Sequence, residues 1–388
     1  MFKHECYKIF TKKSIYIVFF LIVLTMIYAN NLPTDMIMKE EIYEELYETF
    51  GGPVTEEKGK YVREKMRESD AGELVDEISS RTFEDKATGE VHFSVALAHM
   101  IKEQLNERKN ILESKIENSD KSSYEYKDAE KELTMLNQID NTHGFYLIRM
   151  WQGMFDFIEP ATTVIFLSVL IILGLTPVFS DEYTKRTAGL ILATKHGKRK
   201  IITAKIMAAI TYIVIVITSL HLVNGILKWI KHGGIDGWNA PIQGLSGGID
   251  TISMMEYAHS PYDLAVWELY GLTFFLQFIG AVVIAIMVLF VSVNTKNSMI
   301  ALFISGAIIG IPFMISQIGL DRGIIQHLAN FNYSELIKAA GLFEEYITYN
   351  IFGQPILYPT LLFSIFGIIT ALLLYFTYYQ HRNYQVKN

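Results

Sequence analysis

Six long apolar runs constrain this chain more than any other feature of its sequence. A helix needs about 20 mostly apolar residues to cross the roughly 30 Å hydrocarbon layer of a bilayer. With 51% hydrophobic residues, the chain is too apolar and too segmented for one soluble core. The sequence therefore predicts an all-α membrane protein with six transmembrane helices, at Ser14–Asn30, Pro160–Ser180, Ile201–Leu227, Leu264–Val293, Ser298–Ile318 and Tyr358–Tyr379.

Basic residues are concentrated in four short segments: Met1–Lys13, Asp181–Lys205, Asn294–Asn297 and the tail from Gln380. These segments hold 14 of the 34 Lys and Arg residues but only 3 of the 41 Asp and Glu residues. Short loops rich in Lys and Arg stay in the cytoplasm, so both termini are predicted to be cytoplasmic. The net charge of -7 averages two unlike faces and is no argument for or against nucleic acid.

The N-terminal region predicts a short amphipathic helix followed by the first span. Phe2, Cys6, Ile9 and Phe10 recur at helical spacing with lysines on the other face, which is typical of an interfacial helix over residues 1–13. A disordered basic tail is the alternative. The apolar run that follows, over 14–30, is read as an uncleaved anchor, although it also resembles a signal peptide with a cleavage site near residue 29.

A polar domain is predicted between the first two spans, over residues 31–157. Residues 31–150 hold 27 acidic and 16 basic residues, and their apolar positions recur at helical spacing. A helix should end at Gly51–Pro53 and another should open at Thr55, and two further helices should form a hairpin around the polar turn Asn118–Ser123. Cys6 is the single cysteine of the chain, so this domain has no disulfide, which favours a bacterial source.

The remaining residues, 158–388, are predicted to form a five-helix bundle with three connecting segments. The loop at 181–205 is expected to be cytoplasmic, and the loops at 228–263 and 320–357 are expected to be external, the last with a helix over Ser334–Tyr346. An interfacial helix over Phe145–Phe157 should feed the second span.

Catalytic, cofactor and metal sites are not indicated by any motif. No G-x-x-x-x-G-K-[ST] phosphate loop is present, so the chain lacks that route to ATP. His92 and His99 share one helix face, but a metal site would need a further ligand from elsewhere. No catalytic cluster supports an intramembrane enzyme. We therefore expect no enzyme activity, no cofactor and no metal in this chain.

Inside the predicted spans, ionisable residues are scarce, which argues against an ion-coupled pump working alone. Gln277 lies mid-span and is expected to hydrogen-bond to a neighbouring helix, whereas His221 is expected at the outer interface. Gly306 and Gly310 form a G-x-x-x-G pattern, which lets another helix backbone approach closely. That helix belongs either to a second chain or to the same chain, and both readings remain open.

The segment from Phe179 to Lys205 resembles the loop between the second and third spans of bacterial ABC transporter permeases of the type-two exporter class. The family pattern is an acidic residue, a basic residue, a helix of small and apolar residues, and then Gly, Arg and Lys before the next span. The residues that fill these places are Glu182, Arg186, Thr187, Gly189, Leu190, Gly197, Arg199 and Lys205. The large external domain matches only a subset of that family.

The resemblance implies that this loop is a coupling helix docked on a separate cytoplasmic ABC ATPase subunit. It also implies two permease chains, identical or paired with a sister, with Gly306 and Gly310 near their seam. The expected setting is a bacterial plasma membrane, with lipid around the spans and no nucleic-acid partner. The cargo is expected to be amphiphilic, a membrane-active peptide or a lipid-like molecule.

Two alternatives remain at this point. The basic loop is also explained by the positive-inside rule alone, as a signal for topology without a coupling role. The whole chain is also compatible with a membrane-anchored receptor or scaffold, whose external domain binds a ligand and signals inward. A neighbouring gene for a kinase, rather than for an ATPase, would favour that function.

Overall fold

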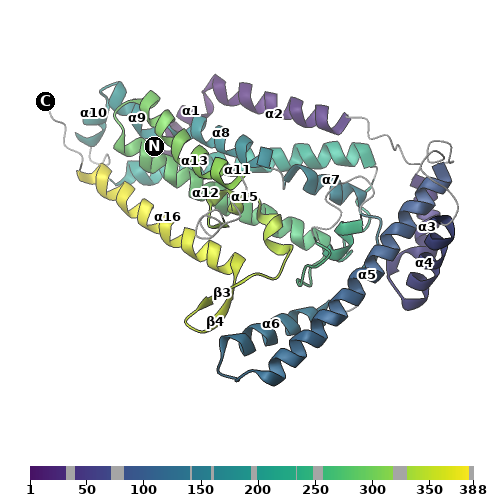
Figure 1. Ribbon diagram of the computed structural model, residues 1–388. Coiled ribbons are helices and arrows are strands. Elements are labelled where there is room, and N and C mark those ends of the chain that lie inside the picture. Colours follow the sequence, from purple (N-terminus) through teal and green to yellow (C-terminus); the bar gives the residue numbers. More distant parts are fainter. Residues whose placement is uncertain are drawn as a thin grey trace.

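The computed structural model describes residues 1–31, 40–70, 83–139, 142–158, 161–193, 199–232, 234–247, 257–317 and 330–383. Within these residues, six helices are long and apolar enough to cross a membrane, which confirms the predicted all-α membrane class. They run side by side, with both chain termini at one end of the bundle (Figure 1). The six helices are α2 (Lys13–Asn31), α8 with its continuation α9 (Ala161–Leu175, Pro177–Thr184), α11 (Lys200–His232), α12 (Val266–Asn294), α13 (Ser298–Gln317) and α16 (Tyr358–Asn383).

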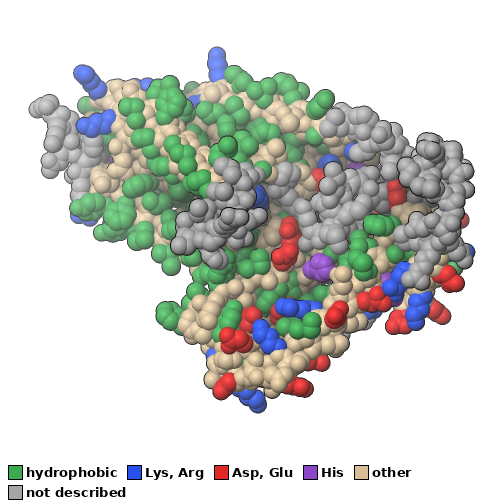
Figure 2. Space-filling view, viewed as in Figure 1, with side chains coloured by type: hydrophobic (Ala, Val, Ile, Leu, Met, Phe, Trp, Pro, Cys, Tyr) green, Lys and Arg blue, Asp and Glu red, His purple; other side chains and the backbone are tan. Residues whose placement is uncertain are grey.

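We call the end that carries both termini the basic end and the opposite end the domain end. Basic side chains are scattered over the basic end, whereas acidic side chains gather over the helices at the domain end (Figure 2). The basic end also carries α1 (Phe2–Phe10), α9 and α10 (Ala188–Ala193). Helix α1 confirms the predicted N-terminal helix, with Ile9 only 1% exposed and packed on the bundle.

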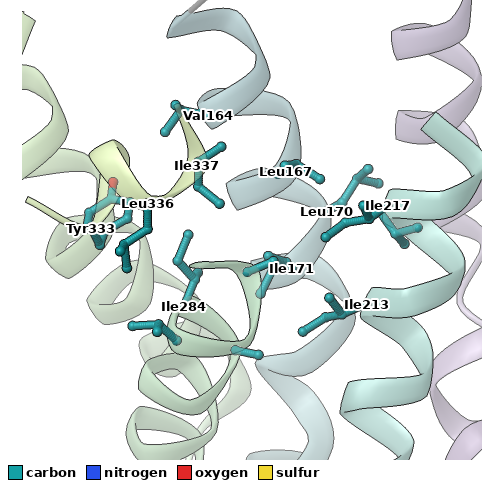
Figure 3. Close-up of a cluster of buried hydrophobic side chains, with 14 of the residues drawn as sticks. Val164, Leu167, Leu170, Ile171, Ile213, Ile217, Ile284, Tyr333, Leu336 and Ile337 are labelled. Atoms are coloured by element: carbon teal, nitrogen blue, oxygen red, sulfur yellow. The ribbon is translucent and has the colours of Figure 1, made fainter. Parts of the chain in front are cut away.

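The core of the bundle is formed by α8, α11 and α12. Figure 3 shows Leu170 and Ile171 of α8 between Ile213 of α11 and Ile284 of α12. Helices α2, α13 and α16 lie at the periphery, with 17%, 22% and 17% of their most apolar segments buried. Because an apolar helix face is stable in lipid without any protein neighbour, these three helices leave much surface for lipid or another chain.

The segment after α13 packs back against the bundle, and its helices differ from the predicted one. It contains α15 (Tyr333–Ile337) and a 3₁₀ helix (Ala339–Phe343) instead of one helix over Ser334–Tyr346. Leu336 lies against Gly280 of α12, where a Cβ atom would come within 2.8 Å of the leucine Cβ. Gly280 is 14 residues, or about 21 Å, from the basic end of α12, and so lies inside the hydrocarbon depth. Irregular backbone is stable there because it is buried in protein.

The polar domain consists of α3 (Glu40–Phe50), α4 (Glu56–Asp70), α5 (Phe83–Asn118) and α6 (Tyr124–Gln138). The predicted helix end at residue 50 and the predicted hairpin of α5 and α6 are confirmed. Arg108 and Glu132 join the two hairpin helices through two hydrogen bonds of 2.8 Å each. Strands β1 (Gly52–Pro53) and β2 (Gly144–Phe145) pair and close the domain above α7 (Arg149–Ile158), the predicted interfacial helix.

A β-hairpin that the sequence analysis did not predict connects this domain to the last span. Strands β3 (Thr348–Ile351) and β4 (Gln354–Leu357) pair in antiparallel register, and α16 follows directly. Phe352 and Gly353 both have positive φ at the turn, as a two-residue hairpin turn requires. Asp128 of α6 accepts hydrogen bonds from Tyr346 and Thr348, at 3.1 and 2.7 Å, so α6 is attached to the start of α16.

Candidate coupling site at the basic end

Four charged side chains form a closed ring at the basic end of the bundle, which we call the ion ring. It consists of Glu5 and Lys8 of α1, Glu182 of α9 and Lys205 of α11. Lys205 Nζ lies 2.7 Å from Glu182 Oε1 and 3.2 Å from Glu5 Oε2. Lys8 Nζ closes the ring at 2.8 Å from Glu182 Oε1 and 2.9 Å from Glu5 Oε1. The two acids balance the two bases, so the ring has no net charge.

Burial of the ring sets its physical role. Lys205 is fully buried, and Glu182 and Glu5 are 6% and 2% exposed. Lys205 also donates a hydrogen bond to Val178 O and lies 4.8 Å from the ring centre of Phe179. Removing one partner of such a pair would leave a buried charge unpaired, at a cost of about 3–5 kcal/mol. The ring therefore holds α1, α9 and the start of α11 in one arrangement.

The pKa of Lys8 reflects the same arrangement. Burial on its own would lower the pKa of Lys8, but its hydrogen bonds to Glu182 and Glu5 outweigh burial and raise the pKa above its usual value. Lys8 therefore stays charged at neutral pH and keeps the ring closed.

Helix α9 begins at a break in the second span. Pro177 follows Thr176 and has no backbone N–H, which ends the hydrogen-bond ladder of α8. Ser292 of α12 replaces the missing partners: its Oγ accepts from Phe179 N at 3.0 Å and Ser180 N at 3.1 Å, and donates to Thr176 O at 2.5 Å. The break thus ties α9 to the basic end of α12.

Helix α9 ends in a Schellman motif, a helix end closed by two backbone hydrogen bonds. Arg186 N donates to Tyr183 O at 3.1 Å, and Thr187 N donates to Glu182 O at 2.9 Å. Arg186 has φ 57°, a left-handed conformation that glycine adopts more easily than arginine. This turn directs the chain from α9 into α10, where Ala188 is buried and Leu190 is exposed.

The predicted coupling residues divide into two groups. Glu182 and Lys205 lie inside the bundle as members of the ion ring, so they do not form a docking surface. Arg186, Thr187 and Arg199 are exposed, Leu190 is 75% exposed and Gly189 is half-buried. Gly197 lies outside the described residues.

Glu5 and Lys8 complete the site, and the sequence analysis did not assign them to it. A signal for them exists, because the basic segments hold only three acidic residues: Glu5, Asp181 and Glu182. The structure gives each of them a specific partner. Glu5 and Glu182 belong to the ion ring, and Asp181 accepts a hydrogen bond from Ser298 Oγ at 2.5 Å, at the start of α13. Acidic residues within a basic segment therefore have specific partners here: an ion pair for Glu5 and Glu182, and a hydroxyl group for Asp181.

Two further expectations concern side chains inside the spans. Gln277 of α12 donates to Ile337 O at 2.8 Å, and its Oε1 lies 2.9 Å from His221 Nε2 of α11. The predicted hydrogen bond to a neighbouring segment is confirmed, and His221 is an additional partner. His221 Nδ1 lies 2.9 Å from the hydroxyl of Tyr270, so both ring nitrogens of His221 have a polar neighbour. His221 and Tyr270 are half-buried.

Gly306 and Gly310 both face open space. A Cβ atom built on either glycine would meet no other described residue within 4 Å. Within the described part of the chain, no helix therefore uses these glycines for close approach. His92 and His99, which share one helix face, have other neighbours: the ring of His92 packs against Phe50, and His99 Nδ1 lies 2.8 Å from Arg63 Nη2.

Comparison with known proteins places the chain in a family. No curated protein and no solved structure matches it. The family model described as ABC-2 family transporter protein matches residues 1–382, which include the polar domain, all six spans and the ion ring. The match covers nearly the whole chain and agrees with the six-span architecture, so the chain belongs to the ABC-2 transporter family as a multi-pass permease subunit of an ABC transporter.

Proposed function

We propose that this permease is the membrane subunit of an ATP-driven exporter in a bacterial plasma membrane, with its basic end in the cytoplasm. The family match supports association with a separate ABC ATPase subunit. The positive-inside rule supports the orientation, since the segments at the basic end carry most of the short-loop Lys and Arg residues. The cargo in this proposal is amphiphilic, a membrane-active peptide or a lipid-like molecule.

The observation that carries the proposal is the arrangement of α9 and α10. Leu190 on α10 exposes an apolar side chain at the basic end, and Arg186, four residues earlier in the chain, and Arg199 are exposed as well. Exposed apolar residues rimmed by charge are typical of protein contacts. Glu182, only four residues before Arg186, belongs to the ion ring. A push on α10 is therefore expected to pass through α9 to α1 and α11.

A second permease chain is part of the proposal. Helix α13 is mostly exposed, and the open face at Gly306 and Gly310 suits close approach of a helix from another subunit. Two chains with two ATPases would enclose a pathway between them, and the amphiphilic cargo would enter it from the cytoplasm or the membrane.

Site-specific crosslinking tests the proposal. The chain is expressed with the ABC ATPase encoded beside it, in a Cys6→Ser background that removes its one cysteine, and Leu190→Cys is treated with a thiol crosslinker. We expect a crosslinked permease–ATPase product and co-purification of the two proteins. Tyr7→Cys is the matched control, because Tyr7 is 66% exposed at the same end on α1. Equal crosslinking at Tyr7, or an ATPase that never co-purifies, would contradict the proposed docking.

A further inference from the structure

A cavity of about 360 Å³ lies at the domain end of the bundle and is lined by residues of α2, α7, α8 and α11. This volume is at the lower end of the range for small-ligand sites. Its deeper wall is largely apolar and includes Met26 of α2, Phe157 of α7 and Phe166 of α8. The cavity is separate from the ion ring, which lies at the opposite end of α11.

The rim of the cavity is basic. Arg149 of α7 and Lys228, Lys231 and His232 of α11 line it. Asp156 is the single acidic side chain among the described residues that line the cavity. Three Lys and Arg side chains thus share the lining with one carboxyl side chain, in a half-enclosed site where charge is less screened than in open water. Such a rim attracts an anionic group.

The depth of the cavity matches the boundary between acyl chains and headgroups. Helix α11 begins at Lys200, so at 1.5 Å per residue Lys228 lies about 42 Å along it. The hydrocarbon layer is about 30 Å thick and the bilayer with headgroups about 40–45 Å. The basic rim therefore lies among headgroups, while Phe166, five residues into α8 from its start at Ala161, lies at the depth of acyl chains.

Local packing keeps this space open and polar at its edge. Gly153 of α7 leaves room for the neighbouring helix: a Cβ atom there would come within 3.0 Å of the Lys228 side chain and 3.4 Å of His232 Nε2. Asn30 donates to Leu227 O at 3.2 Å, but its Oδ1 is buried without a hydrogen-bond partner among the described residues. A buried acceptor of this kind is usually satisfied by an ordered water molecule, because a phosphate or carboxylate oxygen has no proton to donate to it.

We propose that this cavity binds one anionic amphiphile from the leaflet at the domain end. The anionic headgroup, a phosphate or a carboxylate, lies between Lys228, Lys231 and Arg149. The acyl chain passes Met26 and Phe166 and continues into the bilayer, because the cavity is too small to enclose a two-chain lipid. The inference goes beyond the proposed function, because it requires neither an ATPase partner nor a direction of transport. The acidic polar domain at the same end gives no reason to expect a site for an anion.

Native mass spectrometry of the detergent-solubilised full chain tests the site. The probes are dioleoylphosphatidylglycerol, which is anionic, and dioleoylphosphatidylcholine, which has no net charge. We expect saturable binding of one phosphatidylglycerol, at least tenfold tighter than phosphatidylcholine. Lys228→Gln combined with Lys231→Gln should remove that preference. Lys115→Gln combined with Lys121→Gln is the matched control, because it removes the same charge from exposed positions of the polar domain and should leave binding unchanged.

Two further arms separate an amphiphile from a simple anion. Ala29→Trp fills the cavity from α2 and keeps every charge, so it should weaken phosphatidylglycerol binding severalfold. Glycerol phosphate, the free headgroup, should compete only at concentrations at least a hundredfold higher than the lipid. Equal binding of the two lipids by the unmodified chain would overturn the site without involving any variant. Competition by glycerol phosphate at lipid concentrations would reduce it to an anion site and overturn the amphiphile assignment.

Discussion

Glu182 Oε1 of α9 lies 2.7 Å from Lys205 Nζ of α11, and neither side chain reaches the surface of the bundle. The resemblance to exporter permeases would place both residues in contact with an ATPase. Their burial gives them a different part, because a subunit bound at the surface acts on them only through the residues that cover them. The pair connects α9, from which the chain continues into α10, to the long third span α11.

Lys205→Met should destabilise the protein by about 3 kcal/mol, because the carboxylates of Glu5 and Glu182 would keep only Lys8 as a basic partner in the ion ring. Combining it with Glu182→Gln should recover part of this loss, since the buried charge is then removed. Thermal unfolding in detergent measures both. Lys200→Met, at an exposed position of the same helix, is the control and should change stability little. An equal loss of stability in the control would show that the ion ring contributes no more to stability than an exposed lysine does.

Arg186→Gly should leave the free energy of unfolding unchanged or raise it by about 1 kcal/mol. The reason is that glycine adopts the left-handed conformation at φ 57° without strain. Arg186→Ala retains that strain. If the guanidinium group contacts the ATPase, both variants should lose the stimulation of ATPase activity in the co-purified complex. Lys185→Ala removes a neighbouring charge and should retain the stimulation of ATPase activity. Full stimulation in the Arg186→Gly variant would mean that only the turn matters at this position.

Gly306→Leu and Gly310→Leu should leave the stability of a single chain unchanged or slightly higher. A side chain at either glycine meets no described residue within 4 Å, and leucine favours a helix over glycine by up to about 1 kcal/mol. Association of two permease chains, followed by crosslinking in membranes, should nevertheless be lost. Gly367→Leu on α16 is the matched control, since that glycine also faces open space. Association that survives both α13 variants would remove these glycines from the interface.

His143 should make the attachment of the polar domain dependent on pH. Burial lowers the pKa of His143, against the opposing effect of its hydrogen bond to Ala258 O at 2.8 Å. Above pH 6.5 the imidazole is neutral in both the folded and the unfolded chain. Below it the unfolded chain binds the proton first, so folding stability falls as the pH drops towards the folded pKa, by at most about 1.4 kcal/mol per pH unit.

Thermal unfolding at pH 7.5 and pH 5.5 measures this effect. The unmodified chain should lose more stability between the two values than His143→Gln, whose side chain still donates a hydrogen bond but does not titrate. An identical pH dependence in the two proteins would show that folding does not lower the pKa of His143.

Much of the fold follows from the sequence, because apolar length and helical spacing are local signals. All six spans, the hairpin of α5 and α6 and the helix end at Phe50 lie where these patterns predict them. The position of the re-entrant segment with α15 does not follow from these patterns. Its residues are apolar enough to pack in the core but too few to cross the membrane. The β3–β4 hairpin is not predicted either, because it lacks a local signal. Its turn is Phe352–Gly353, without the Asn-Gly or Asp-Gly pair that signals such a turn.

The candidate site is only partly predictable from the sequence, because a sequence motif does not show which of its side chains are buried. Glu182, Arg186 and Lys205 fill similar places in the family pattern, yet the structure buries the first and the last and exposes Arg186. Partners such as Glu5, more than 170 positions away from Glu182, arise from tertiary packing and have no local signal beyond their isolated charge.

Helix α11 is one uninterrupted rod of 33 residues with no proline, so it should tilt as a stiff body. Lys205, in the ion ring, and Lys228, at the cavity that we propose binds an anionic amphiphile, are separated along it by about 35 Å. A pivot near the middle of this rod would swing the two lysines in opposite directions. A movement of Lys205 driven by nucleotide hydrolysis at one membrane face would then widen or narrow the cavity at the other face. A ligand bound in that cavity would in return oppose or favour the movement.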